Sequence, residues 1–377
     1  MQITVAGHLC LDIIPEWQTG TLAALQPGRM VHMEGVTFST GGAVANTGIA
    51  LKRLGFDPVL IGRTGDDPVG DIIRNLLRRE DINPDYIALS PGETSSYTVV
   101  LNPPDTDRIF LHYPGTNDSF SVQDLDFGAI PPGIVHFGYP PLMRQMYIEQ
   151  GAQLENFFKT AKAHGLITSL DMALPDPSSE QGKVDWKAIL QRVLSFVDLF
   201  LPSIDELLFM MDSSAYDKVQ RGFSRLDTSL LDDLSSTVLG WGAKAVGIKL
   251  GEEGLFLRTG AEAGATFGAS WRNRHILAPI FRVPVQGTTG AGDTTIAGFL
   301  AGVALDKTPE QVLTLATAVG AFCVEAISSV AGVPHLQRVE ERIDRGWERM
   351  QPTIINDSWR LGQSGVFLGP ADCSELN

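Results

Sequence analysis

Short apolar runs alternate with helix-like segments along most of the chain, and this alternation is the feature that most restricts its fold. The strand-like runs are ITVAGHL (3–9), DPVLIGRTG (57–65), GIVHFGY (133–139), LITSLDM (166–172), VDLFLPS (197–203) and AVGIKL (245–250). Segments with helical spacing of apolar residues lie between or after them, at 43–54, 68–77, 145–164, 185–195 and 204–212. Such alternation is typical of a mostly parallel sheet covered by helices on both faces, so we predict an α/β fold.

Two segments interrupt the alternation, at 14–38 and 93–117, where helical periodicity is lost. The second contains SYTVVLN and RIFLHYP around PPDTD, a pattern that predicts a β-hairpin. Polar strands that interrupt an α/β core often form a separate small sheet, and we interpret both segments as a β lid. We therefore predict one domain over 1–349, lid included, and a C-terminal tail over 350–377 of unassigned role.

Composition argues against several kinds of partner. The chain has 29 Lys and Arg against 44 Asp and Glu, a formal net charge of −15, which repels nucleic acid and anionic membranes. Its longest apolar run, 312–324, is shorter than the roughly 18 residues of a spanning helix, and its N-terminus lacks the basic region of a signal peptide. Three scattered cysteines and seven unclustered histidines predict reduced thiols and no transition-metal site. We expect a cytoplasmic protein.

The stretch VQGTTGAGDTTIAG (285–298) has the glycine spacing of a phosphate-binding loop, G-x-x-x-x-G-K-[ST]. Asp293 stands where that loop has lysine, which excludes a P-loop NTPase, and Thr295 excludes the dinucleotide fingerprint G-x-G-x-x-G. A turn without function remains an alternative, although so many glycines make a turn entropically unfavourable.

A phosphate site explains the loop better. Gly290, Ala291 and Gly292 lead into an apolar helix, whose first N–H groups are unpaired and carry the positive end of the macrodipole. Small residues let a phosphate approach these groups closely. Asp293 is then free to accept the proton of a hydroxyl that attacks the γ-phosphate. We predict phosphoryl transfer with a backbone anion hole at 290–293 and Asp293 as general base.

The stretch GTTGAGDTTIAGFLAG (287–302) resembles the C-terminal signature of the ribokinase family, the phosphofructokinase-B-type carbohydrate kinases. GGAVANTGIALKRLG (41–55) resembles the N-terminal signature of the same family, and the resemblance covers about residues 1–345. It implies a ribokinase-like three-layer αβα fold with a small β lid. It also implies an enzyme that uses ATP and Mg²⁺ to phosphorylate a primary hydroxyl of a sugar or sugar-like molecule. Similar proteins often pair their lids, so a homodimer formed through the lid is a further expectation.

Two other functions stay open on the same residues. A purine nucleoside kinase of this fold would use the same base and anion hole over a larger apolar pocket. A non-catalytic sugar- or nucleotide-sensing protein would keep the fold without turnover, and two departures from the family pattern, Gly287 and Ser203, favour it. Relatives have an aspartate at the place of Gly287, where it helps to hold a monovalent cation, so the resemblance does not extend to potassium dependence and we leave that property open.

The resemblance assigns roles to residues of this chain. The catalytic group is Asp293 with Gly290, Ala291 and Gly292, and the substrate-binding residues are Asp12, Gly41, Gly42 and Asn46. Asp171 joins the substrate side because it ends a strand, where ligands gather in α/β sheets. The nucleotide-binding residues are Lys249, Gly251, Gly254 and Thr288, although IKLGEEGLFL (248–257) also fits an ordinary hairpin.

Glu206 has two interpretations. In similar proteins a glutamate at this place orders water around Mg²⁺, and we assign Glu206 that role. Ser203 and Glu206 also have the S-x-x-E spacing of a capping box, which is purely structural.

Overall fold

The computed structural model describes residues 1–377 except 105, 107, 223–225, 327–329, 363 and 374–377. Eleven strands of this described part form one sheet, in the order β14-β15-β13-β12-β11-β10-β9-β8-β1-β4-β5. Their bounds are β1 (Gln2–Gly7), β4 (Val59–Gly65), β5 (Ile87–Ser90), β8 (Gly133–Gly138), β9 (Ile167–Leu170), β10 (Leu199–Phe200), β11 (Ala245–Lys249), β12 (Leu255–Thr259), β13 (His275–Ala278), β14 (Arg360–Leu361) and β15 (Phe367–Leu368).

Neighbouring strands pair in parallel through β5, β4, β1, β8, β9, β10 and β11. Beyond β11 the strands β12, β13, β15 and β14 each pair antiparallel with the strand before. Strand β1 lies inside the parallel part of the sheet, between β4 and β8, and Thr4 is opposite Val59 of β4 and Val135 of β8. The predicted mostly parallel sheet is confirmed. Because parallel strands end at the same edge, the residues that follow β1, β8, β9 and β10 gather on one side of the molecule.

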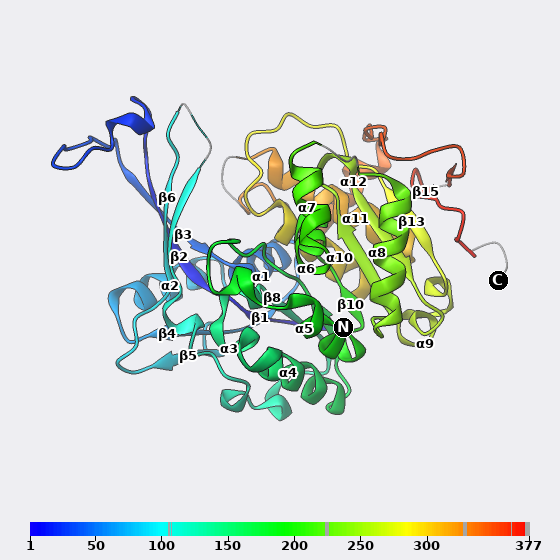
Figure 1. Cartoon of the computed structure of the whole chain (residues 1–377), viewed down its shortest axis with the longest axis horizontal. Coiled ribbons are helices and arrows are strands. Elements are labelled where there is room, and N and C mark those ends of the chain that lie inside the picture. The colour runs from blue at the N-terminus through cyan, green and yellow to red at the C-terminus, as the bar shows by residue number, and fades with distance from the viewer. Residues whose placement is uncertain (105, 107, 223–225, 327–329, 363, 374–377) are drawn as a thin grey trace.

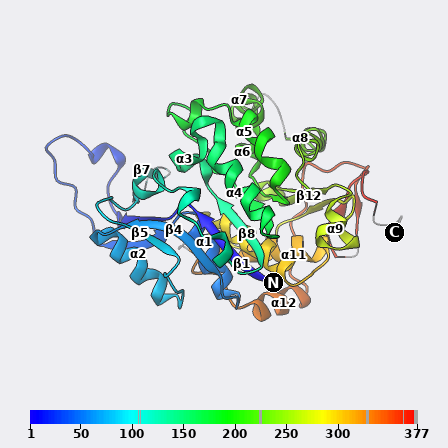
Figure 2. The same cartoon turned by 90° about the horizontal axis from the view of Figure 1, so that it is seen from below.

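Helices cover both faces of the sheet (Figure 2), which confirms the three layers. On one face lie α1 (Ala43–Arg53), α2 (Pro68–Arg79), α10 (Ala291–Ala304), α11 (Pro309–Val324) and α12 (Leu336–Asp344); on the other lie α3 (Arg144–Tyr147), α4 (Ala152–Ala163), α5 (Trp186–Val193), α6 (Ile204–Met211), α7 (Ser213–Gln220) and α8 (Thr228–Gly240). A short helix, α9 (Ala263–Phe267), follows β12. No helix of the described residues is long and apolar enough to cross a membrane.

Two hydrophobic cores lie on the two faces of the sheet. In β1, Ile3 and Val5 belong to one core with helices α1, α10 and α11, whereas Ala6 belongs to the other. This alternation follows from the period of two of a strand. The core beneath α1 and α10 holds these helices against each other and so positions their first turns.

The single helix predicted over 145–164 is wrong. Helix α3 ends at Tyr147 and α4 begins at Ala152, because Glu149 and Gln150 have left-handed backbone with φ of 51° and 56°. Apolar side chains at helical spacing continue across the break, so periodicity alone did not show it. The strand predicted over 197–203 is also shorter, since β10 spans Leu199–Phe200.

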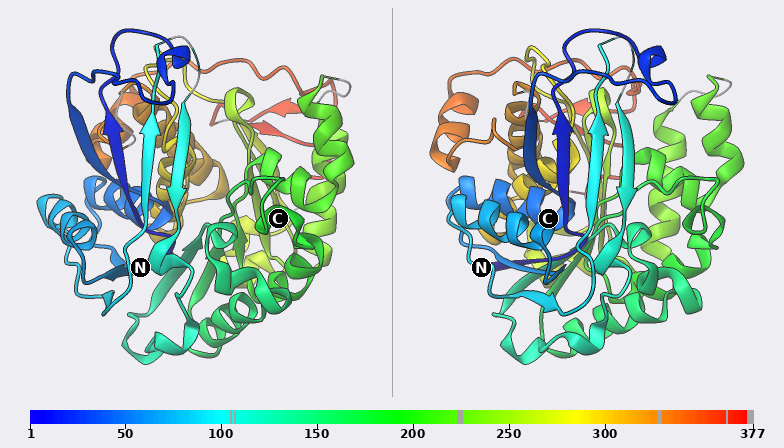
Figure 3. Two further views of the ribbon diagram at one scale, coloured as in Figure 1. Left: turned by 60° about the vertical axis from the view of Figure 1, so that its left-hand side comes forward. Right: turned by 90° about the vertical axis from the view of Figure 1, so that its left-hand side faces the viewer.

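The two predicted lid segments contribute to a separate sheet of four strands, counted over the described residues, in the order β3-β2-β6-β7. These strands are β2 (Cys10–Pro15), β3 (Val36–Gly41), β6 (Tyr97–Leu101) and β7 (Ile109–Tyr113), and residues 105 and 107 between β6 and β7 lie outside the described part. The small sheet projects from the edge of the main body, as Figures 1 and 3 show. Because β2 begins shortly after β1 ends, the small sheet continues from the edge at which the parallel strands of the main sheet end.

The described part of the tail packs against the main sheet. Strand β15 pairs with β13, and the ring of Trp359 lies 4.6 Å from that of His275 and 6.3 Å from that of Phe256. The carboxylate of Asp372 accepts hydrogen bonds from Arg274 Nε at 3.0 Å and from the His275 amide at 2.9 Å. Residues 363 and 374–377 of the predicted tail lie outside the described part. The tail therefore extends the antiparallel edge of the sheet.

We predict that Trp359→Ala lowers the free energy of unfolding by about 3–5 kcal/mol, the usual loss for a buried aromatic residue. Trp359 is only 8% exposed, whereas Leu361 in the same tail is 66% exposed. Leu361→Ala is the control and should change stability by about 0.5 kcal/mol or less. Urea unfolding followed by circular dichroism measures both, and equal small effects would show that the tail is not docked in solution.

Candidate active site

The N-terminus of α10 provides a place for an anion. Gly290 precedes the helix with a left-handed φ of 75°, and Asp293 lies in the first turn, where it is 2% exposed. The Ala291 amide donates to Thr288 O at 3.2 Å. In the described structure the amides of Gly292 and Asp293 have no backbone acceptor. These two amides, at the positive end of the helix dipole, are therefore the free donors of the predicted anion hole.

Two side chains from distant parts of the chain hold the carboxylate of Asp293. Asn46 Nδ2 donates to Oδ2 at 2.9 Å, and the Tyr139 hydroxyl lies 2.8 Å from Oδ1. Burial raises the pKa of Asp293, and the hydrogen bonds from Asn46 and Tyr139 act in the opposite direction. The amide oxygen of Asn46 is buried without a partner in the described structure, so it can accept a hydrogen bond from a bound hydroxyl.

Tyr139 was not identified from the sequence, although its strand was. It follows β8 and precedes Pro140, and its φ of 64° is left-handed, which is uncommon for a bulky residue. Strained backbone of this kind gathers at functional sites. Its place at the carboxyl end of a central parallel strand was the signal available in the sequence.

Three of the predicted substrate-binding residues, Asp12 of β2, Gly41 and Gly42, lie close together. A side-chain carbon at Gly41 would be 2.5 Å from the Asp12 carboxylate, and one at Gly42 would be 2.5 Å from His8 Nδ1. Burial, and to a smaller extent the charge of Asp293, raises the pKa of Asp12 to about 6. A side chain at either position would therefore collide with Asp12 or His8, and this packing explains both glycines without any ligand.

Two histidines that the sequence did not single out lie beside this group. His8 is 2% exposed, and neither ring nitrogen has a partner in the described structure. Its ring lies 5.3 Å from that of His112, which is bonded to Thr98 of the small sheet at 2.9 Å, and 6.2 Å from that of Tyr139. Burial, together with His112, lowers the pKa of His8 to about 3, so the ring is neutral near pH 7.

A cluster of buried charges adjoins the helix terminus. Lys249 Nζ lies 2.6 Å from Asp171 Oδ1, and a side-chain carbon at Gly292 would lie 3.7 Å from the same nitrogen. Burial alone would lower the pKa of Lys249, but the carboxylates of Asp171 and Glu206 raise it, so the ammonium stays charged. Asp171, which we predicted on the substrate side, is thus an ion-pair partner of Lys249, a predicted nucleotide-binding residue.

Glu206 and Ser203 form the capping box that their S-x-x-E spacing predicted. Its Oε2 accepts the Ser203 amide at 2.6 Å, and Ser203 Oγ accepts the Glu206 amide at 3.2 Å. Burial raises the pKa of Glu206 and of Asp171, and Asp293 adds a third carboxylate near Lys249. One ammonium cannot compensate three buried carboxyl groups, which agrees with their raised pKa values, and Asp171 Oδ2 has no partner in the described structure. Carboxyl oxygens are the donors that Mg²⁺ prefers, but no group of three His, Cys, Asp or Glu side chains among the described residues is arranged as a complete metal site, so water or phosphate would have to supply further ligands.

A cavity of about 570 Å³ joins the nucleotide-side residues predicted from the sequence. Its polar end contains Lys249, Gly251, Gly254, Thr288, Ala291 and Gly292. Its other walls are largely apolar and include Leu255, Ile280, Phe281, Val283, Val324 and Met350. A cavity with a cationic end and an apolar end matches the phosphates and the base of a nucleotide.

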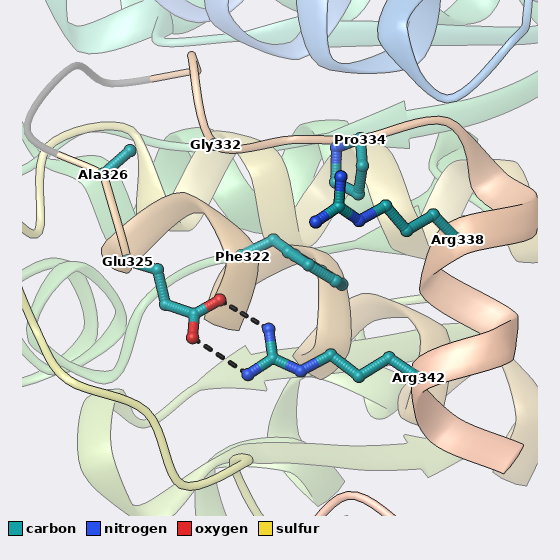
Figure 4. Close-up of a pocket in the computed structure, with 7 residues that line it drawn as sticks. All are labelled: Phe322, Glu325, Ala326, Gly332, Pro334, Arg338 and Arg342. Atoms are coloured by element: carbon teal, nitrogen blue, oxygen red, sulfur yellow. Dashed lines mark hydrogen bonds and ion pairs between the residues drawn. The ribbon is translucent and has the colours of Figure 1, made fainter. Parts of the chain in front are cut away.

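A second hollow, of about 390 Å³, lies between α11 and α12 (Figure 4). Arg342 there donates to both carboxylate oxygens of Glu325, at 2.6 and 2.9 Å, and its guanidinium lies over the rings of Phe322 and Trp347. The charge of Arg342 is therefore already compensated, and its contacts fasten α12 to α11. The cavity at α10 is the better candidate for an active site because it adjoins Asp293.

The protein-family model described as pfkB family carbohydrate kinase matches residues 3–336, so the chain belongs to that family. A fructokinase from Klebsiella pneumoniae is 25% identical over 344 residues, which cover 89% of this chain and 96% of that protein. The predicted family and the predicted enzyme class, a carbohydrate kinase, are confirmed.

Solved structures confirm the ribokinase-like fold. That of ribokinase from Arabidopsis thaliana complexed with ribose and ATP has a TM-score of 0.68 and 21% identity, covering 90% of this chain and 97% of that one. A structure from E. coli in complex with ATP and Mg²⁺ has a TM-score of 0.67 and 21% identity, covering 91% of this chain and 99% of that one.

We predict that Lys249→Met lowers the free energy of unfolding by about 3–5 kcal/mol, because it leaves buried carboxylates without their cation. The control is Lys307→Met, which removes a partly exposed ion pair with Glu340 and should change stability by about 1 kcal/mol or less. Denaturant unfolding at pH 7 measures both. A loss no larger than that of the control would mean that Asp171 and Glu206 are not charged together in the folded protein.

Proposed function

We propose that this carbohydrate kinase transfers the γ-phosphate of ATP to a primary hydroxyl of a neutral sugar or sugar-like molecule, with Asp293 as general base. The observation that carries the proposal is the position of Asp293. Its side chain is held by Asn46 and Tyr139 on the side of Asp12 and the histidines, and its amide faces the anion hole. One residue therefore belongs to the acceptor site and to the phosphate site.

The acceptor hydroxyl takes the place of the Tyr139 hydroxyl at the carboxylate of Asp293, and the free Asn46 Oδ1 accepts a second hydroxyl. Asp293 removes the proton as the acceptor oxygen attacks the γ-phosphorus. The amides of Gly292 and Asp293 and the Lys249 ammonium stabilise the charge on the transferred group.

Mg²⁺, when bound, neutralises charge on the adjacent phosphates of the nucleotide. Glu206, through water, and the free Asp171 Oδ2 would hold it. The four-stranded sheet acts as a lid that excludes water, since its strands carry Asp12 and His112 to the acceptor side.

The acceptor side that surrounds Asp293 has two neutral imidazoles, His8 and His112, and the carboxyl group of Asp12, whose pKa of about 6 leaves it mostly ionised near pH 7. His8 and His112 have lowered pKa values, and burial raises that of Asp12, so a cationic group for a second phosphate is not among these three residues. The site thus favours an uncharged polyol over a phosphorylated sugar.

We predict that Asp293→Asn lowers kcat by about 10²–10⁴-fold, the usual contribution of a general base, while Mg-ATP still binds. Mg-ATP-dependent ADP release is measured with pentoses, hexoses, sugar acids, phosphosugars and nucleosides as acceptors. Asp306→Asn, exposed beyond the other end of α10, is the control and keeps full activity.

The outcomes of that experiment separate the functions. Turnover with a neutral sugar, lost in Asp293→Asn, supports the proposal, and turnover with nucleosides alone would replace it by a nucleoside kinase. Background release with every acceptor from the wild-type protein would contradict kinase activity.

We predict that Tyr139→Phe moves the acid limb of the kcat/KM profile to higher pH. The hydroxyl of Tyr139 favours the charged carboxylate, so its removal raises the pKa of Asp293, and the ionised base is lost sooner as pH falls. Tyr147→Phe, on α3 and packed against Trp186, is the matched control and leaves the profile unchanged. An unshifted acid limb in Tyr139→Phe would show that this hydroxyl does not tune the base.

A further inference from the structure

The first residues of the tail form part of the wall of the α10 cavity. Met350 lines this cavity together with Ile280 and Phe281, and its amide donates to Ile280 O at 2.9 Å. The Arg282 amide donates to Glu348 O at 2.8 Å, so the two segments run side by side. The family match ends at residue 336, so Met350 lies beyond the matched residues, whereas Ile280 and Phe281 lie within them.

Met350 belongs to the apolar part of the cavity lining. Its neighbour Ile280 and, from α11, Val324 are apolar as well, although Arg282 also lines the cavity beside this segment. Met350 keeps 36% of its surface exposed although it faces this hollow. A flat apolar ring bound there would cover it, and a thioether packs well against aromatic rings.

Hydrogen bonds and ring contacts of Arg349 and Thr353 hold the segment around Met350 against two neighbouring parts of the chain. Arg349 donates to Pro279 O and to Thr314 Oγ1, each at 2.9 Å, and its guanidinium lies 4.3 Å from the ring centre of Phe281. The Thr353 amide donates to Glu253 Oε2 at 2.6 Å, and Thr353 Oγ1 donates to the other carboxylate oxygen. Glu253 belongs to the turn that carries the cavity residue Gly251. The tail thus links the β11–β12 turn to the segment after β13.

We propose that the tail completes the nucleotide pocket, and that Met350 binds the base of the nucleotide and not its phosphates. This inference rests on the proposed function, because it takes the cavity to be the nucleotide site. It gives the tail a role in nucleotide affinity that is separate from its packing against β13.

The test uses the full-length protein and needs no acceptor. Binding of Mg-ADP and of Mg-pyrophosphate, which lacks a base, is measured by calorimetry for the wild type, Met350→Ala and Met350→Leu. Leu361→Ala, an exposed tail residue outside the cavity, is the matched control. We expect Met350→Ala to weaken Mg-ADP binding by about 5–20-fold, as for loss of a partly buried apolar side chain. Pyrophosphate binding should stay unchanged, and Met350→Leu should restore most of the affinity for ADP.

The outcomes separate the inference about Met350 from the proposed kinase function. Unchanged ADP affinity in Met350→Ala would overturn the inference while leaving the kinase proposal intact, and so would an equal loss of ADP and pyrophosphate binding. A wild-type protein that binds neither ligand would overturn the proposed function itself, and the inference with it. A selective loss of ADP affinity, absent from Leu361→Ala, supports the inference.

Discussion

The buried carboxylate of Asp293 is the point on which the arrangement of the site depends. It joins Asn46, which lies 247 residues earlier in the chain, and Tyr139, which ends a central strand. A buried carboxylate needs such donors, since an unpaired one would be strongly unfavourable. Packing of α1 against α10 brings Asn46 to it, and the strained backbone of Tyr139 directs the phenol toward it. The carboxylate of Asp293 thereby connects three segments that are far apart in the chain: α1, the end of β8 and α10.

Charge explains how so acidic a chain can hold a polyanion. With a net charge of −15, the protein as a whole repels phosphates, so attraction must be local. In the proposed function the helix terminus and Lys249 supply it, and the carboxyl groups around Lys249 would provide oxygen donors for a cation. The acceptor side has neutral histidines instead, such as His8. The cationic groups thus lie on the phosphate side of Asp293, and the imidazoles on its acceptor side are neutral.

Because the glycine-rich stretch is contiguous, the sequence predicted that a helix begins there with Asp293 in its first turn. Strand–helix alternation likewise predicted the α/β fold. The hydrogen bond from Asn46 to Asp293 could not be predicted from the sequence, because it depends on how α1 and α10 pack against each other. Tyr139 and His8 each stand alone at a strand end, without a spacing that marks them. The tail over 350–377 showed no periodicity because its two-residue strands exist only through pairing, of β15 with β13 and of β14 with β15. Spacing predicts local structure, and tertiary packing decides which side chains meet.

The most direct test of this account is a crystal structure with Mg-ADP and aluminium fluoride, which imitates a phosphoryl group in transfer. The account predicts that the fluoride group lies within about 3 Å of the amides of Gly292 and Asp293, a hydrogen-bond distance. It also predicts that ADP fills the cavity toward Met350. Aluminium fluoride bound away from α10, for example in the hollow beside Arg342, would contradict the central claim that Asp293 joins the phosphate site to the acceptor site.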